Sequence, residues 1–138
     1  MKAERVVVDA NLAFKALAAG RGDLRERLAA PAEVRLFAPR FLFVELFKHK
    51  EALAVAAKVP PQAMLEALHT LVTRLEFVNE ANIPLTTWMA AYRLCRSVDE
   101  KDTPYVALAL HPAGRLWTED QELKSGLEAR GFDRWFEP

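Results

Sequence analysis

Three consecutive valines in the segment 5–8 constrain the fold more than any other feature of this chain. A short, continuous β-branched run is typical of a strand that is buried on both faces, as in a parallel sheet. Apolar runs at 34–38 and 115–118 predict two further strands, and a shorter one is expected at 77–78. Helical patterns separate these runs. Strands that alternate with helices indicate an α/β domain with a mainly parallel sheet.

The helical patterns have recognisable starts and stops. Gly20 fits the end of the first helix, and proline residues break the chain or open a new helix at several points. The predicted helices cover residues 12–19, 23–30, 40–58, 61–75, 104–110 and 121–130, and Pro84 introduces one more. Residues 132–136 are expected to add a final edge strand.

Composition fits one compact domain over residues 1–138. Hydrophobic residues make up 51% of the chain, which is enough for a substantial core and too many for a disordered chain. The formal net charge is zero. Because nucleic-acid-binding domains are often strongly basic, this balance does not indicate such a domain, but it does not exclude one.

The single cysteine, Cys95, excludes an intrachain disulfide and any multi-cysteine metal site. It falls in an apolar helical pattern, so we expect it to be buried. The sequence shows neither the features of a signal peptide nor an apolar segment of membrane-spanning length. A cytoplasmic protein is therefore expected.

Four acids, Asp9, Glu45, Asp102 and Asp120, lie on or beside apolar elements. Burying a carboxylate is costly unless it is paired or bound to a cation. Asp9 and Asp120 each follow a predicted strand, and ligands of parallel sheets collect at the carboxyl ends of the strands. The arrangement suggests metal-dependent hydrolysis at a shared site.

Each acid also has a purely structural explanation. Asp9 and Asp120 could cap the helices that follow them, and Asp102 could complement the dipole of the next helix. Glu45 could pair with His49, four residues further along a helix. These alternatives remain open from the residues alone.

Motifs of several other chemistries are absent. The sequence has no GxxxxGK[ST] loop, GxGxxG turn or HExxH motif, and its three histidines are dispersed. Neither Ser97 nor Ser125 lies where a nucleophile on a sharp turn would be expected. Common nucleotide-binding motifs, a zinc-protease motif and a serine triad are therefore unsupported.

Four segments in order resemble the PIN domain family over nearly the whole chain. The segments are VVVDAN at 6–11, PRFLFVEL at 39–46, DEKDTPYVALAL at 99–110 and LWTED at 116–120. Each segment is weak alone, but their order and spacing together are specific. The third and fourth resemble a prokaryotic subgroup with an Asp-x-Pro-Tyr/Phe segment before the Ala-Leu-Ala-Leu helix.

The resemblance implies a Rossmann-like three-layer α/β/α sandwich and a ribonuclease that depends on Mg²⁺ or Mn²⁺. By motif, Asp9, Glu45, Asp102 and Asp120 would form its catalytic and metal-binding acidic site. Supporting polar positions would be Asn11 and Thr118, and Asp99 matches a recurrent extra acid. Asn11 could hold another carboxylate by a hydrogen bond.

The resemblance also implies partners. Many small prokaryotic members are VapC-like toxins of toxin–antitoxin pairs, so an RNA substrate, an antitoxin protein and a homodimer or higher oligomer are expected. Lys15, Lys48 and Arg93 are candidates for RNA contact. The apolar helices at 40–58 and 61–75 could present a partner surface, or their apolar residues could form the domain's own core.

Other functions stay open. The chain could be a non-catalytic PIN-like domain that binds RNA or protein, with its acids capping helices. A receiver-like phosphoacceptor normally has two early acids, whereas this chain has one, Asp9. A phosphatase of the haloacid dehalogenase type would need an acid at position 11, where Asn11 stands.

Overall fold

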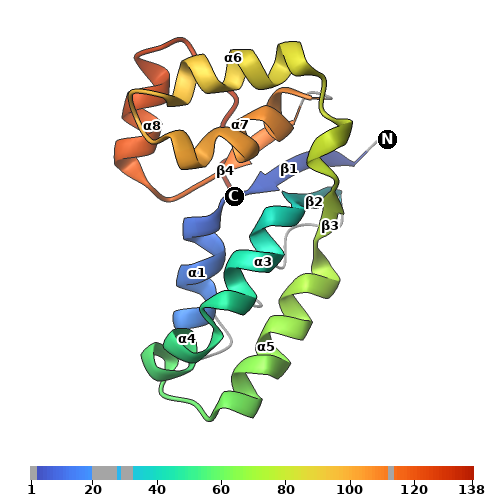
Figure 1. The fold of residues 1–138 in the computed structure, drawn as a ribbon, viewed down its shortest axis with the longest axis vertical. Coiled ribbons are helices and arrows are strands. Elements are labelled where there is room, and N and C mark those ends of the chain that lie inside the picture. Colours follow the sequence, from blue (N-terminus) through green and yellow to red (C-terminus); the bar gives the residue numbers. More distant parts are fainter. Residues whose placement is uncertain (1–2, 20–27, 29–32, 112–113) are drawn as a thin grey trace.

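A parallel sheet of four strands organises the chain (Figure 1). The computed structural model describes residues 3–19, 28, 33–111 and 114–138. The strands are β1 (Glu4–Val8), β2 (Val34–Pro39), β3 (Glu76–Val78) and β4 (Arg115–Trp117), in the order β3-β2-β1-β4. Every neighbouring pair is parallel. The carboxyl ends of all four strands therefore lie along one edge.

The valine run forms β1, as predicted. This strand lies between β2 and β4, with Val7 opposite Phe37 on one side and Leu116 on the other. Its three valines are at most 2% exposed. Burial on both faces explains why the run is continuously apolar rather than alternating.

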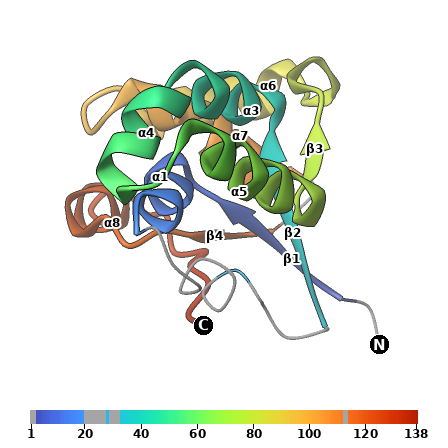
Figure 2. The same ribbon diagram turned by 90° about the horizontal axis from the view of Figure 1, so that it is seen from below.

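Helices flank the sheet, which confirms the predicted α/β/α fold class with its mainly parallel sheet. They are α1 (Ala10–Ala18), α3 (Arg40–Lys48), α4 (Lys50–Ala57), α5 (Pro61–Arg74), α6 (Leu85–Cys95), α7 (Thr103–Leu110) and α8 (Gln121–Glu128). Two short 3₁₀ turns, η1 (Glu80–Asn82) and η2 (Glu100–Asp102), precede α6 and α7. In Figure 1, α6, α7 and α8 lie above the sheet and α1, α3, α4 and α5 lie below it. The view from below shows α1 beginning where β1 ends (Figure 2).

Helix α7 is apolar on all sides because it lies in the centre of the packing. It contacts β1, β2 and β4, and α6 packs along it. Ala91 and Cys95 of α6 are fully buried. The expectation that Cys95 is a buried free thiol is confirmed.

Two sequence-based elements are wrong. The single helix expected at 40–58 is interrupted at His49, whose backbone (φ −99°, ψ 16°) leaves the helical region. The turn lets α4 pack against α1 and α5 while α3 stays on β2, so tertiary packing overrides the continuous helical pattern. The strand expected at 132–136 is reduced to one bridge, between Leu116 and Trp135.

The helix expected at 23–30 lies outside the described residues except for Leu28, which is helical and buried. Gly20 lies outside them too. Among the residues that the structure describes, no helix is both long and apolar enough to cross a membrane.

Candidate functional site

Asp9 lies at the carboxyl end of β1 and is 1% exposed. One carboxylate oxygen, Oδ1, accepts a hydrogen bond from the Leu12 amide at 2.8 Å and so caps α1. The other, Oδ2, accepts a short hydrogen bond from the Thr118 hydroxyl. Burial raises the pKa of Asp9 from 3.8 to about 6, although these two hydrogen bonds oppose the increase. Asp9 is thus both the residue that caps α1 and a buried acid of the candidate site.

Asp120 follows β4 and is built in the same way. Its Oδ1 caps α8 by accepting hydrogen bonds from the Glu122 and Leu123 amides, at 3.0 and 3.1 Å. Its Oδ2 accepts one from the Asn11 side chain at 3.2 Å, as expected for a residue that holds another carboxylate. In both acids, one oxygen caps a helix and the other contacts a side chain from a different part of the chain.

Thr118 joins the two acids. Its hydroxyl donates to Asp9 and accepts from the Asp120 amide at 3.0 Å. The side chain is 3% exposed, so water does not compete for these contacts. Thr118 and Asn11 therefore couple the end of β1 to the end of β4.

Asp102 ends η2 and immediately precedes α7. It is half-buried, and no hydrogen bond among the described residues involves its carboxylate. Burial, followed by the negative charges of Asp99, Asp9 and Asp120, raises its pKa from 3.8 to about 7. The structure thus brings Asp102 into the electrostatic field of the other two acids.

Asp99 is exposed and caps η2, since its Oδ1 accepts a hydrogen bond from the Lys101 amide at 3.0 Å. Its charge is the second largest cause of the raised pKa of Asp102, after burial. Asp99 therefore acts on the site through charge, from its edge.

Glu45 is the fourth acid of the predicted site. It extends from α3 and pairs with His49, with 3.6 Å between Oε2 and Nε2. The charge of Glu45 contributes to the raised pKa of Tyr105. It is not among the charges that raise the pKa of Asp9 or of Asp102. The structural alternative for Glu45, a pair with His49, is thus the contact that is present.

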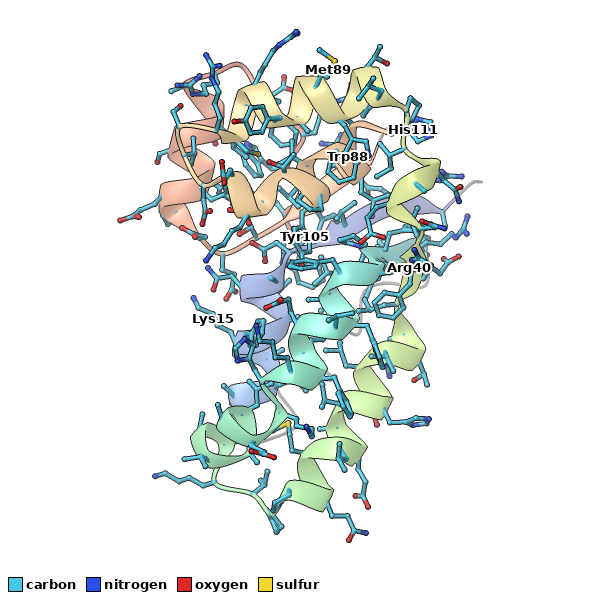
Figure 3. All side chains as sticks on the ribbon, viewed as in Figure 1. Lys15, Arg40, Trp88, Met89, Tyr105 and His111 are labelled. Atoms are coloured by element: carbon cyan, nitrogen blue, oxygen red, sulfur yellow. The ribbon has the colours of Figure 1, made fainter. Side chains whose placement is uncertain are left out.

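Tyr105 is a buried residue of α7 to which the sequence analysis gave no role in the site. It is 1% exposed, and its hydroxyl has no hydrogen-bond partner among the described residues. Burial raises its pKa most, followed by the charges of Asp9, Asp102, Glu45 and Glu80. Figure 3 places its ring between α7 and α3. The sequence feature that could have identified Tyr105 is its hydroxyl group within the apolar helical segment 104–110.

Glu80 is a second residue that the sequence analysis missed. It follows β3 at the same edge of the sheet, and its Oε2 accepts a hydrogen bond from the Phe41 amide at 2.9 Å. Its Oε1 lies 3.5 Å from Nε of Arg40, which Figure 3 labels beside β3. The signal was an acid two residues after a predicted strand, the same pattern that drew attention to Asp120.

The three basic residues considered for RNA contact are exposed and lie on separate helices: Lys15 on α1, Lys48 on α3 and Arg93 on α6. None of them forms an ion pair with another described residue. No acid in the described ranges therefore competes with a ligand for their charges.

Carboxylate oxygens are the ligands that Mg²⁺ and Mn²⁺ prefer, so the chemistry of Asp9, Asp102 and Asp120 fits such an ion. Among the described residues, however, no three acid, histidine or cysteine side chains converge closely enough to hold a metal ion. Asp9 and Asp120 instead direct their oxygens at protein donors. Such donors offset part of the cost of charge at a buried site.

The fold and these residues define an α/β protein with mutually coupled carboxylates at the carboxyl edge of a parallel sheet. A family model described as the PIN domain matches residues 7–135. The chain belongs to the PIN domain family, as the four sequence segments predicted.

The fold is similar to that of a solved structure. It is the crystal structure of VapBC2 from Rickettsia felis bound to a DNA fragment from their promoter. The TM-score is 0.61 at 14% sequence identity, and the match covers 88% of this chain and 92% of that chain. A comparison with curated proteins gave no match.

Proposed function

We propose that the chain is a metal-dependent endoribonuclease whose site is formed by Asp9, Asp102 and Asp120, with Glu45 as a fourth acid. The observation that carries the proposal is the coupling of the three aspartates on a PIN fold. Burial and neighbouring negative charges raise the pKa of Asp9 to about 6 and that of Asp102 to about 7. Perturbed pKa values of this kind cluster at functional sites.

Asp9, Asp102 and Asp120 would hold Mg²⁺ or Mn²⁺. Such an ion, when bound, supplies an activated water for in-line attack on a phosphodiester and stabilises the leaving oxygen. Thr118 and Asn11 keep the Asp9 and Asp120 carboxylates in place through the hydrogen bonds already described. Glu45 would bind the ion or orient the attacking water from α3, after leaving His49. Lys15, Lys48 and Arg93 would contact the RNA backbone.

Cleavage assays test this assignment. Wild type, Asp9→Asn and the control Glu66→Gln would be incubated with structured and single-stranded RNAs in EDTA, Mg²⁺ and Mn²⁺. Glu66 is an exposed acid on α5, away from the aspartates. We expect cleavage by wild type and Glu66→Gln only with metal, and none by Asp9→Asn. Cleavage of RNA by the Asp9→Asn variant would contradict the proposal.

We further propose that the chain is the toxin of a toxin–antitoxin pair. Support comes from the VapBC2 structure, which shares the fold, and from the exposed face of α3. Phe41, Phe43, Val44 and Phe47 are between 42% and 58% exposed there, while Leu42 and Leu46 are buried. A groove of about 760 Å³ runs beside this face and is bounded by Val72 and Phe77. We assign this surface to an antitoxin segment or to the second subunit of a homodimer.

Growth and light scattering test the toxin role. Wild-type protein that is induced in cells should arrest their growth by cleaving RNA in the cytoplasm. Induced Asp9→Asn protein should not arrest growth. Light scattering of the purified protein gives the oligomeric state. A Phe43→Ser variant that leaves a dimer intact would exclude the α3 face as the dimer interface.

One observation favours a second function, a non-catalytic PIN-like domain that binds RNA or protein. Asp9, Asp99 and Asp120 each cap a helical segment, so structure alone explains part of their placement. A melting temperature that does not change with Mg²⁺ or Mn²⁺, together with no cleavage, would support this function.

A further inference from the structure

We propose that a groove between α6 and the start of α7 binds single-stranded RNA and directs it to the aspartates. The groove has a volume of about 880 Å³ and is lined by residues of α6, η2 and the first turn of α7. The inference rests on the proposed ribonuclease function and names the form of its substrate.

The groove carries three cations that are not paired with any acid in the described part of the chain. Arg93 and Arg96 line one wall and Lys101 the other, against a single acid, Glu100. None of the three forms an ion pair with a described residue. Several arginines elsewhere behave differently: Arg35, Arg40 and Arg115 are paired with Glu76, Glu80 and Glu4. In a chain with no net charge, the groove is therefore a local excess of positive charge that suits a phosphate backbone.

The same groove offers flat and polarisable surfaces. Tyr92 and Met89 are 47% and 45% exposed, so much of each side chain is open to contact with a ligand. Trp88 is half-buried, and its indole Nε1 donates a hydrogen bond to the Glu80 carbonyl at 3.2 Å. In Figure 3, Trp88 points from α6 toward α7, and Met89 points away from it. Trp88, Tyr92 and Arg96 follow one another at intervals of four residues, so they form one row along the helix.

Aromatic rings interleaved with cations are the features that bind unpaired nucleotides, because each base can stack on a ring while cations contact the phosphates. A duplex would keep its bases stacked inside and could not use Tyr92 in this way. The groove therefore favours a single strand.

The groove also leads to the aspartates. Lys101 and Thr103 line its wall, and they are the residues on either side of Asp102. A strand that lies along α6 and crosses η2 therefore passes next to an acid of the proposed site. This continuity separates the groove from an unrelated basic surface.

A second copy of the chain is a poorer occupant. In a two-fold dimer the same patch faces itself, which would bring the Arg93, Arg96 and Lys101 charges of both subunits together. Like charges without acids opposite them oppose such a contact.

Fluorescence anisotropy in EDTA tests the proposal without cleavage. The probe is a labelled 12-nucleotide single-stranded RNA of mixed sequence, with the same sequence as a duplex for comparison. The variants are Tyr92→Ala and the pair Arg93→Ala/Arg96→Ala, and the control is Arg74→Ala/Arg130→Ala. Arg74 and Arg130 are exposed arginines outside the groove.

We expect Tyr92→Ala to weaken binding of the single strand about fivefold or more, as for the loss of one stacked base. The groove pair should weaken it further and lower the slope of log affinity against log salt by about 1.4, or about 0.7 for each phosphate contact. The control pair should bind with an affinity closer to that of wild type.

Several results would overturn the inference: no binding by wild type at low salt, tighter binding of the duplex, or equal effects of the groove and control pairs. A change in oligomeric state by light scattering, without a change in RNA affinity, would assign the groove to a second copy. The proposed function fails separately. If wild type binds through the groove but does not cleave RNA with metal, the groove stands and the nuclease does not.

Discussion

Replacing Asp9 by Asn should make the metal-free protein more stable at pH 8 and less stable near pH 4. The pKa of Asp9 rises from 3.8 to about 6 in the folded protein, chiefly because of burial. The native state therefore holds a proton that the unfolded state releases between these values, and wild type loses stability as the pH rises through that window. Above it the loss amounts to about 3 kcal/mol, at 1.36 kcal/mol for each pH unit.

Asparagine removes this charge but changes the hydrogen bonds. Its carbonyl oxygen can still cap α1 through the Leu12 amide, where Asp9 now accepts a bond of 2.8 Å. Its amide group cannot accept the bond that Thr118 donates, and Thr118 already accepts from the Asp120 amide. The hydroxyl proton loses its partner, which costs about 1 kcal/mol. The net gain at pH 8 is therefore about 2 kcal/mol, and near pH 4 the cost of about 1 kcal/mol prevails.

Urea denaturation in EDTA, followed between pH 4 and pH 8, measures this difference. Glu66→Gln is the control, and we expect it to stay within about 0.5 kcal/mol of wild type. An Asp9→Asn variant that is less stable than wild type at pH 8, or whose difference does not depend on pH, would refute the reasoning. Either result would mean that burial does not raise the pKa of the Asp9 carboxyl group.

Three further predictions concern the stability of the folded protein. Mg²⁺ should raise the melting temperature more at pH 8 than at pH 6, because Asp9 and Asp102, with pKa values of about 6 and 7, must lose protons to bind it; equal increases in thermal melts would contradict this. Tyr105→Phe should raise the free energy of unfolding in EDTA by about 1 kcal/mol, because it removes a buried hydroxyl without a described partner; a loss in urea denaturation would show that the hydroxyl is satisfied. Gly126→Ala should lower it by about 1–2 kcal/mol, since the new Cβ would lie 2.7 Å from Cγ1 of Val98; an unchanged midpoint would show that Val98 can move.

The sequence was sufficient for the sheet because its strands carry strong local signals. The valine run predicts a central strand, and prolines or glycines mark most helix limits. The break at His49 had no such signal, since the residues around it continue a helical apolar pattern. It depends on how α4 meets α1 and α5, which is a contact between distant segments.

The acids show the same division between local and distant information. The position of Asp9 and Asp120 after strands follows from local pattern, and parallel strands bring those ends to one edge. The hydrogen bond from Asn11 to Asp120 spans 109 residues, but it was within reach of prediction because both flank such strand ends. The position of Glu45 was harder to predict, because a helical acid can face a site or a neighbouring turn, and here it contacts His49.

Helix capping does not account for all of the acids. It uses one oxygen of Asp9 and one of Asp120, and it leaves the other oxygen of each to contacts with Thr118 and Asn11. Asp102 is the decisive residue, because its carboxylate caps nothing and accepts no hydrogen bond from a described residue. A half-buried acid beside three other negative charges destabilises the fold, and asparagine or serine would serve the same helix start without that cost. A structural role alone therefore gives no reason for an acid at this position, whereas a site that binds a cation does.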